Sequence, residues 1–319
     1  MKRSTKLAIV LPPVLVVATL AGLLATTATI NAVATRDEDA RIEPYGQRVA
    51  VGGRELNVVV SGDHDQTVVL LPGLGTAAPG LDFAPLIDEL DDTYRVVAVE
   101  PFGTGLSDQT DVPRTAENIA AEVHEALQQL GVERYVLAGH SISGVYALSY
   151  VEAYRDEVVA FVGIDSSVPG QPSGEDPIAT DAVVLLRDLG ITRLLRDLAP
   201  DPYDVEAYDG ATREQIRMLE ARNTAAPTMI DEMRRAADNF AEATGRTFPV
   251  DLPVLLFVRV DDLDVDGWLE LHEAQAASVT RGVVVRMTGD HYLHRTLSAD
   301  LAEGIRAFLS EASVPGSAD

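Results

Sequence analysis

Ser141 lies in a segment where a serine hydroxyl could become reactive. The apolar run 134–138 is followed by a turn and then by a helical pattern over 142–154, and the turn reads Gly139-His140-Ser141-Ile142-Ser143-Gly144. A helix that begins at Ile142 would point its positive N-terminal end at Ser141 and favour anionic intermediates there. A serine hydroxyl is a poor nucleophile near neutral pH, so this chemistry needs an adjacent base.

Histidine is the natural base for such a serine, and the chain has six histidines and no cysteine. The lack of cysteine excludes thiolate nucleophiles, disulfides and cysteine-ligated metals. No two histidines have the His-x-x-x-His spacing of a helical metal site, and Gly73-Leu74-Gly75 lacks the third glycine of a dinucleotide-binding loop. We therefore expect neither a metal nor a cofactor.

Three segments together resemble the α/β-hydrolase family. Residues 139–144 resemble its nucleophile elbow, with Ser143 where the motif has glycine. Residues 70–75 resemble the segment after the third strand, with Pro72 in place of the usual histidine, and residues 100–107 resemble the glycine-containing loop after the fourth strand. The resemblance covers about residues 48–165 and 250–310, which is most of the chain after its N-terminal segment.

The resemblance implies roles for individual residues. Ser141 would be the nucleophile, and His291, directly after the last strand-like run, would be the base, with His294 as the alternative. The backbone N–H groups of Leu74 and Ile142 would form the oxyanion hole.

The same resemblance places the acid after the seventh strand. The family has a glycine at the end of this strand and the acid three residues later, and Arg259 stands at the glycine position, which favours Asp262. Asp261 is the close alternative because the missing glycine weakens the register. Other aspartates remain less favoured candidates: Asp264 and Asp266 in the same loop, and Asp165 at the end of strand six, a location that some family members use.

The elements that must position these residues alternate along the chain. Two runs around Gly52-Gly53 predict a hairpin, and short apolar strands then alternate with amphipathic helices. This pattern predicts an α/β fold, a mostly parallel doubly wound sheet, over residues 47–165 and 253–319. Residues 166–252 carry only helical patterns, which predicts a helical cap inserted between strands six and seven.

The N-terminal segment predicts a membrane anchor. Residues 7–35 contain no charged side chain, and Lys2, Arg3 and Lys6 precede them. A transmembrane helix within residues 1–35, with the basic residues in the cytoplasm, would place the rest of the chain outside the cell membrane behind a tether over 36–46. The alternative is a signal peptide cleaved at Ala32-Val33-Ala34, which would make the protein secreted.

Composition narrows the function further. The chain has 319 residues, of which 46% are hydrophobic, and a formal charge of −25, which disfavours nucleic-acid binding. We expect an extracytoplasmic serine hydrolase that cleaves a small-molecule ester, thioester, lactone or amide through an acyl-enzyme. The alternatives are an aminopeptidase-type hydrolase of the same fold and a non-catalytic ligand-binding protein. The sequence leaves the substrate and the oligomeric state open.

Overall fold

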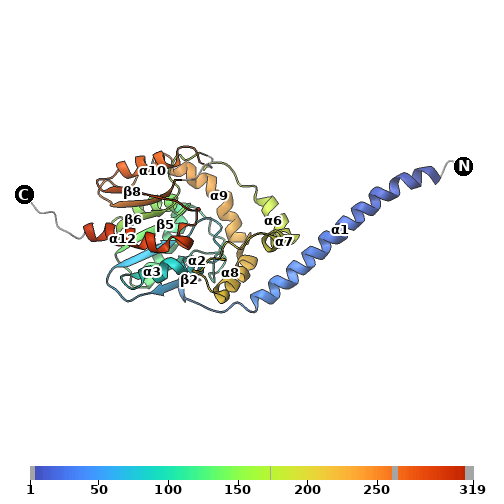
Figure 1. The fold of residues 1–319 in the computed structure, drawn as a ribbon, viewed down its shortest axis with the longest axis horizontal. Coiled ribbons are helices and arrows are strands. Elements are labelled where there is room, and N and C mark those ends of the chain that lie inside the picture. Colours follow the sequence, from blue (N-terminus) through green and yellow to red (C-terminus); the bar gives the residue numbers. More distant parts are fainter. Residues whose placement is uncertain (1–3, 173, 261–264, 313–319) are drawn as a thin grey trace, which may run out of the picture.

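A computed structural model describes residues 4–172, 174–260 and 265–312, and its strands form one eight-stranded sheet (Figure 1). The strand order is β1-β2-β4-β3-β5-β6-β7-β8. β1 and β2 pair antiparallel, β2 pairs antiparallel with β4, and all other pairs are parallel. The strands are β1 Gln47–Val51, β2 Arg54–Ser61, β3 Thr67–Leu71, β4 Arg95–Glu100, β5 Tyr135–His140, β6 Val158–Ile164, β7 Val254–Arg259 and β8 Gly282–Met287.

The predicted hairpin and the mostly parallel sheet are confirmed. Gly52 and Gly53 join β1 to β2 with φ angles of 55° and 78°, which glycine adopts without steric cost. Side chains in β3 alternate between the two faces, so Val68 and Leu70 join one core cluster while Val69 and Leu71 join the other.

Helices cover both faces of this sheet. The core on one face includes residues of α3 and α12, and the core on the other includes residues of α4, α5 and α10. These helices are α3 Ala84–Leu90, α12 Ser298–Ala312, α4 Ala116–Gln129, α5 Ser143–Tyr154 and α10 Trp268–Ala277, and two short helices are α2 Pro79–Asp82 and α11 Leu293–Thr296.

Between β6 and β7, the described residues form four further helices, which we call the inserted helices. They are α6 Thr180–Asp188, α7 Ile191–Leu198, α8 Gly210–Asn223 and α9 Pro227–Ala243. As the sequence predicts, the described residues between 166 and 252 include no strand.

The N-terminal helix α1, Ser4–Asp39, projects away from the rest of the molecule (Figure 1). Its stretch Leu15–Asp39 contains an 18-residue window with a mean hydropathy of 1.7 and is long and apolar enough to cross a bilayer. The helix continues through Asp39, so the first part of the predicted tether is helical.

Candidate active site

Ser141 occupies a strained turn between β5 and α5. Its φ angle is 53°, and only two other non-glycine residues in the described part of the chain, Asp165 and Ala225, have positive φ. The Ser141 carbonyl accepts hydrogen bonds from the N–H groups of Ser167 at 2.7 Å and Gly144 at 3.0 Å, which hold the turn closed. Backbone strain of this kind persists only where surrounding contacts enforce it, and it marks functional positions.

Small residues make this turn possible. A Cβ atom on Gly139 would lie 3.0 Å from Cβ of Ser143, and one on Gly144 would lie 2.2 Å from the Ser167 carbonyl oxygen. Ser143, which departs from the motif's glycine, donates its hydroxyl hydrogen to the Pro72 carbonyl. The departure therefore ties the turn to the loop after β3.

That loop passes directly beside Ser141. A Cβ atom on Gly73 would lie 3.0 Å from Cβ of Ser141. The N–H groups of Leu74 and Ile142 donate no hydrogen bond to any residue that the structure describes. Two free donors next to a serine suit the stabilisation of a tetrahedral oxyanion.

His291 and Asp165 form a close pair at the same edge of the sheet. The Nδ1 atom of His291 lies 2.6 Å from Oδ2 of Asp165, and the imidazole ring remains 32% exposed while Asp165 is fully buried. The other carboxylate oxygen, Oδ1, accepts the Arg259 N–H at 3.0 Å and the Trp268 Nε1–H at 3.0 Å. Both oxygens are thus engaged, and the carboxylate holds the imidazole with a proton on Nδ1.

The sequence favoured Asp262 for this position, with Asp261 as the alternative. Both residues lie outside the described part of the chain. The structure places Asp165, the candidate at the end of the sixth strand, on His291 Nδ1. The sequence signal for Asp165 was its position at the end of the sixth strand. Because β6, β7 and β8 are neighbours in the sheet, the loops that carry Asp165 and His291 leave the same edge.

Comparisons with known proteins find relatives over most of the chain. The model of the alpha/beta hydrolase family matches residues 68–303. The chain belongs to the alpha/beta hydrolase family. It is 25% identical over 271 residues to the uncharacterized protein YbdG of Bacillus subtilis, which covers 81% of this chain and 83% of that protein. It is also 28% identical over 225 residues to the 2-hydroxy-6-oxononadienedioate/2-hydroxy-6-oxononatrienedioate hydrolase of Paraburkholderia phymatum, covering 67% and 77% of the two chains.

A solved structure of a bacterial membrane phospholipase A has the same fold, with a TM-score of 0.61 and 20% identity. The match covers 97% of this chain and 99% of that chain.

In this alpha/beta hydrolase, His294 lies in a separate buried ion pair. The His294 ring is fully buried, and its Nε2 atom lies 2.7 Å from Oδ2 of Asp82, whose Oδ1 accepts Arg295 Nε–H at 2.8 Å. Burial alone would raise the pKa of Asp82, but His294 and Arg295 outweigh it and lower this pKa. These two side chains hold the Asp82 carboxylate ionised in the interior.

His140 packs against the proposed base. Its ring centroid lies 4.6 Å from that of His291, and its Nε2–H donates to the His291 carbonyl at 3.0 Å. Burial and the two nearby histidines lower the pKa of His140 well below 6.5, so the ring stays neutral. His140 is therefore a positioning residue for the loop that carries His291.

The loop 100–107 has a structural role. The buried Glu100 carboxylate accepts hydrogen bonds from the Tyr45 hydroxyl at 2.6 Å, the Asn57 amide at 2.9 Å and the N–H groups of Gly80 at 3.0 Å and Leu106 at 2.8 Å. Burial raises the pKa of Glu100, and these donors offset part of that rise.

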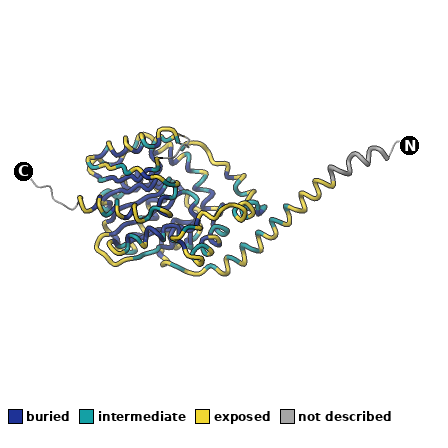
Figure 2. The backbone as a smooth tube through the Cα atoms, viewed as in Figure 1, coloured by how far each residue is buried: buried dark blue, intermediate teal, exposed yellow. Residues whose placement is uncertain are grey.

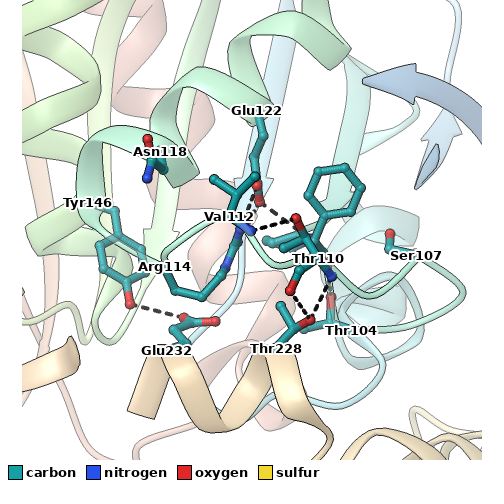
Figure 3. Close-up of polar contacts among 12 residues, drawn as sticks. Thr104, Ser107, Thr110, Val112, Arg114, Asn118, Glu122, Tyr146, Thr228 and Glu232 are labelled. Atoms are coloured by element: carbon teal, nitrogen blue, oxygen red, sulfur yellow. Dashed lines mark hydrogen bonds and ion pairs between the residues drawn. The ribbon is translucent and has the colours of Figure 1, made fainter. Parts of the chain in front are cut away.

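A second buried cluster, which sequence reasoning missed, ties α9 to α5 and lies beside the start of α4 (Figure 3). Arg114 donates two hydrogen bonds to Glu122 at 2.6 and 2.5 Å, and the Tyr146 hydroxyl donates to Glu232 of α9 at 3.0 Å. Burial raises the pKa of Glu232, and Arg114 offsets part of that rise. The cluster fixes the helix that also carries Met233.

The described residues contain no group of three or more His, Asp or Glu side chains placed to hold a metal ion.

Proposed function

We propose that this protein is a serine hydrolase that cleaves carboxylic esters, with Ser141 as nucleophile, His291 as base and Asp165 as the acid. The observation that carries the proposal is the pairing of a strained serine turn with a buried Asp165–His291 hydrogen bond at one edge of the sheet. Thioesters, lactones and small amides are acyl compounds that the same chemistry would attack.

The reaction would proceed through an acyl-enzyme. The Ser141 Oγ atom attacks the carbonyl carbon while its proton passes to Nε2 of His291, and Asp165 stabilises the resulting imidazolium. The N–H groups of Leu74 and Ile142 bind the oxyanion. When the tetrahedral intermediate collapses, the alcohol leaves with the proton from Nε2, and a water molecule then releases the acid by the same route.

The inserted helices would form a cap that selects the substrate. α9 lies against the loop after β3, because a Cβ atom on Gly75 would be 3.6 Å from the terminal methyl group of Met233. The Tyr203 hydroxyl, by contrast, accepts a hydrogen bond from Arg295, and the Tyr208 hydroxyl donates one to the Asp82 carbonyl. Met233 is therefore the side chain we assign to the acyl pocket, and the two tyrosines hold the cap in place.

The N-terminal helix would anchor the enzyme in the cell membrane with its catalytic part outside the cytoplasm. The apolar run 7–35 and the basic residues before it support this topology.

The experiment that tests the reaction is a double-mutant cycle on the full chain with p-nitrophenyl esters of graded acyl length. Ser141→Ala and His291→Ala should each lower kcat by several orders of magnitude, and the double variant should be no worse because the pair acts as a unit. Ser310→Ala, which alters an exposed serine on α12, is the matched control and should keep full activity. Additive losses, or more than a tenth of the activity left in Ser141→Ala, would contradict the assignment.

A further inference from the structure

Exposed apolar side chains gather at one end of the molecule. Among the described residues, seven of the 18 exposed large apolar side chains lie in α1 and six lie within residues 178–198, whereas the others are single valines at scattered positions. The six are Ile178, Leu185, Leu186, Leu194, Leu195 and Leu198. Soluble proteins rarely expose such a concentration of large apolar groups unless it meets a partner.

The pair α6–α7 carries five of these six side chains. α7 has no buried residue at all, and Leu198 at its end is 76% exposed. Figure 2 shows this exposed pair at the end of the body that faces the projecting part of α1. Because α7 buries no residue, burial of apolar side chains in the core does not explain why this helix carries so many of them.

The helix α1 is joined to this region by a specific set of contacts. The Arg193 guanidinium of α7 donates to both carboxylate oxygens of Glu38 at 2.6 and 2.7 Å, to the Thr35 hydroxyl at 2.9 Å and to Asn31 Oδ1 at 2.9 Å. Closer to the N-terminus of α1, a Cβ atom on Gly190 would lie 2.6 Å from the Thr27 carbonyl oxygen. The part of α1 from Thr27 to Glu38 therefore lies against the inserted helices.

These contacts set the level of the bilayer. If α1 is anchored as proposed above, the uncharged residues before Thr27, 7–26, are available to span the membrane. About 20 helical residues span about 30 Å, the thickness of the hydrocarbon core. Since α6 and α7 lie beside the point where this span ends, they lie at the membrane surface (Figure 1).

The charge of this region also suits a lipid surface. Residues 178–198 contain three arginines and three aspartates and are neutral, whereas the whole chain carries −25. Anionic lipids repel acidic surfaces within a Debye length, so a neutral end can approach a bilayer that the rest of the chain would avoid.

We infer that α6 and α7 form a membrane-contacting surface, with Leu194, Leu195 and Leu198 seated at the boundary between headgroups and acyl chains of a phospholipid bilayer. Arg193, bound to Glu38, fixes this surface at the depth that α1 sets. The inference rests on the proposed anchoring, and it predicts that the cap is held on the bilayer, where amphiphilic esters gather.

The test uses the full chain, which has no cysteine to interfere with labelling. Leu198→Cys on α7, Leu20→Cys in α1 and Val250→Cys are each labelled with an environment-sensitive nitrobenzoxadiazole dye and reconstituted into phosphatidylcholine vesicles. Val250 is the matched control because its side chain is 64% exposed and lies just before the opposite end of β7. We expect blue-shifted emission and quenching by nitroxide-labelled lipids at positions 20 and 198, and neither change at position 250.

Each other outcome overturns the inference in a recognisable way. Quenching at position 20 without quenching at 198 would keep the anchor and reject the lipid-contacting surface. No quenching at position 20 would reject the anchor as well. A blue shift at 198 that nitroxide lipids do not quench would assign this surface to a second copy of the chain. Because the readout is independent of ester hydrolysis, none of these results depends on the catalytic proposal.

Discussion

The substitution Asp165→Asn tests whether the Asp165 carboxylate determines which imidazole nitrogen of His291 carries the proton. In the wild type, Oδ1 of Asp165 accepts the N–H groups of Trp268 and Arg259, and Oδ2 faces His291 Nδ1. An asparagine oxygen at the Oδ1 position would keep both of those donors paired. Its NH₂ group would then face Nδ1, so the imidazole would have to accept there and carry its proton on Nε2. With Nε2 protonated, His291 cannot take the proton of Ser141.

The opposite orientation of the asparagine amide restores the correct tautomer but is costly. It would point the NH₂ group at two buried donors, and each unsatisfied buried group costs about 1–3 kcal/mol. The unproductive orientation is therefore favoured by about 2–6 kcal/mol. A carboxylate-to-amide change of this kind in a serine triad lowers kcat by about 10⁴, which corresponds to about 5.4 kcal/mol in activation free energy.

The assay is steady-state hydrolysis of a p-nitrophenyl ester by the full chain in detergent, with fluorescence of the single tryptophan, Trp268, as the check on folding. Asp165→Asn should lose about 10⁴ in kcat with little change in KM, and Asp262→Asn should retain near wild-type activity. The double variant Asp165→Asn/Trp268→Phe, read by far-ultraviolet circular dichroism instead, should recover part of the loss because one opposing donor is gone. If Asp262→Asn loses the activity and Asp165→Asn keeps it, Asp165 is not the acid that holds His291.

Three further outcomes follow from buried polar groups. Ser143→Ala removes the hydroxyl that bonds the Pro72 carbonyl, so chemical denaturation should show a loss of about 1–3 kcal/mol in the free energy of unfolding; an unchanged midpoint would contradict this. Asp82→Asn leaves the buried Arg295 cation without its partner and should cost about 3–5 kcal/mol at neutral pH. Because the folded-state pKa of Asp82 is lowered, the wild type should keep this stability above the ordinary value of 3.8 and lose it as the pH falls below that value. For Glu232 the sign is opposite, since its pKa is raised: wild-type stability should fall as the pH rises from 4.5 through the folded-state pKa, and urea titrations of Glu232→Gln should lack that decline.

The sheet could be predicted because its signals are local. Apolar runs of strand length alternate with amphipathic helices, and Gly52-Gly53 marks the hairpin. The turn at Ser141 could be predicted for the same reason, since a turn of small residues between strand and helix is visible in a short window.

The pairing of Asp165 with His291 and the docking of α1 depend on contacts between distant segments. The preference for Asp262 was counted from the position where the family has a glycine at the end of the seventh strand. This chain has Arg259 there, and the Arg259 N–H donates a hydrogen bond to Asp165. Asp165 and His291 are 126 positions apart, and only the order of β6, β7 and β8 in the sheet brings them together. The partners of Arg193 are also out of reach, because Glu38 is 155 positions away on a helix whose composition indicates only a membrane span.

Whether Ser141 is the nucleophile is tested most directly by covalent labelling of the full chain with a fluorophosphonate, followed by mass spectrometry of its peptides. We predict one phosphonyl adduct, on Ser141, that forms far more slowly in His291→Ala and is absent from Ser141→Ala. An adduct that persists in Ser141→Ala, or a folded wild-type chain that hydrolyses esters without forming any adduct, would contradict this prediction.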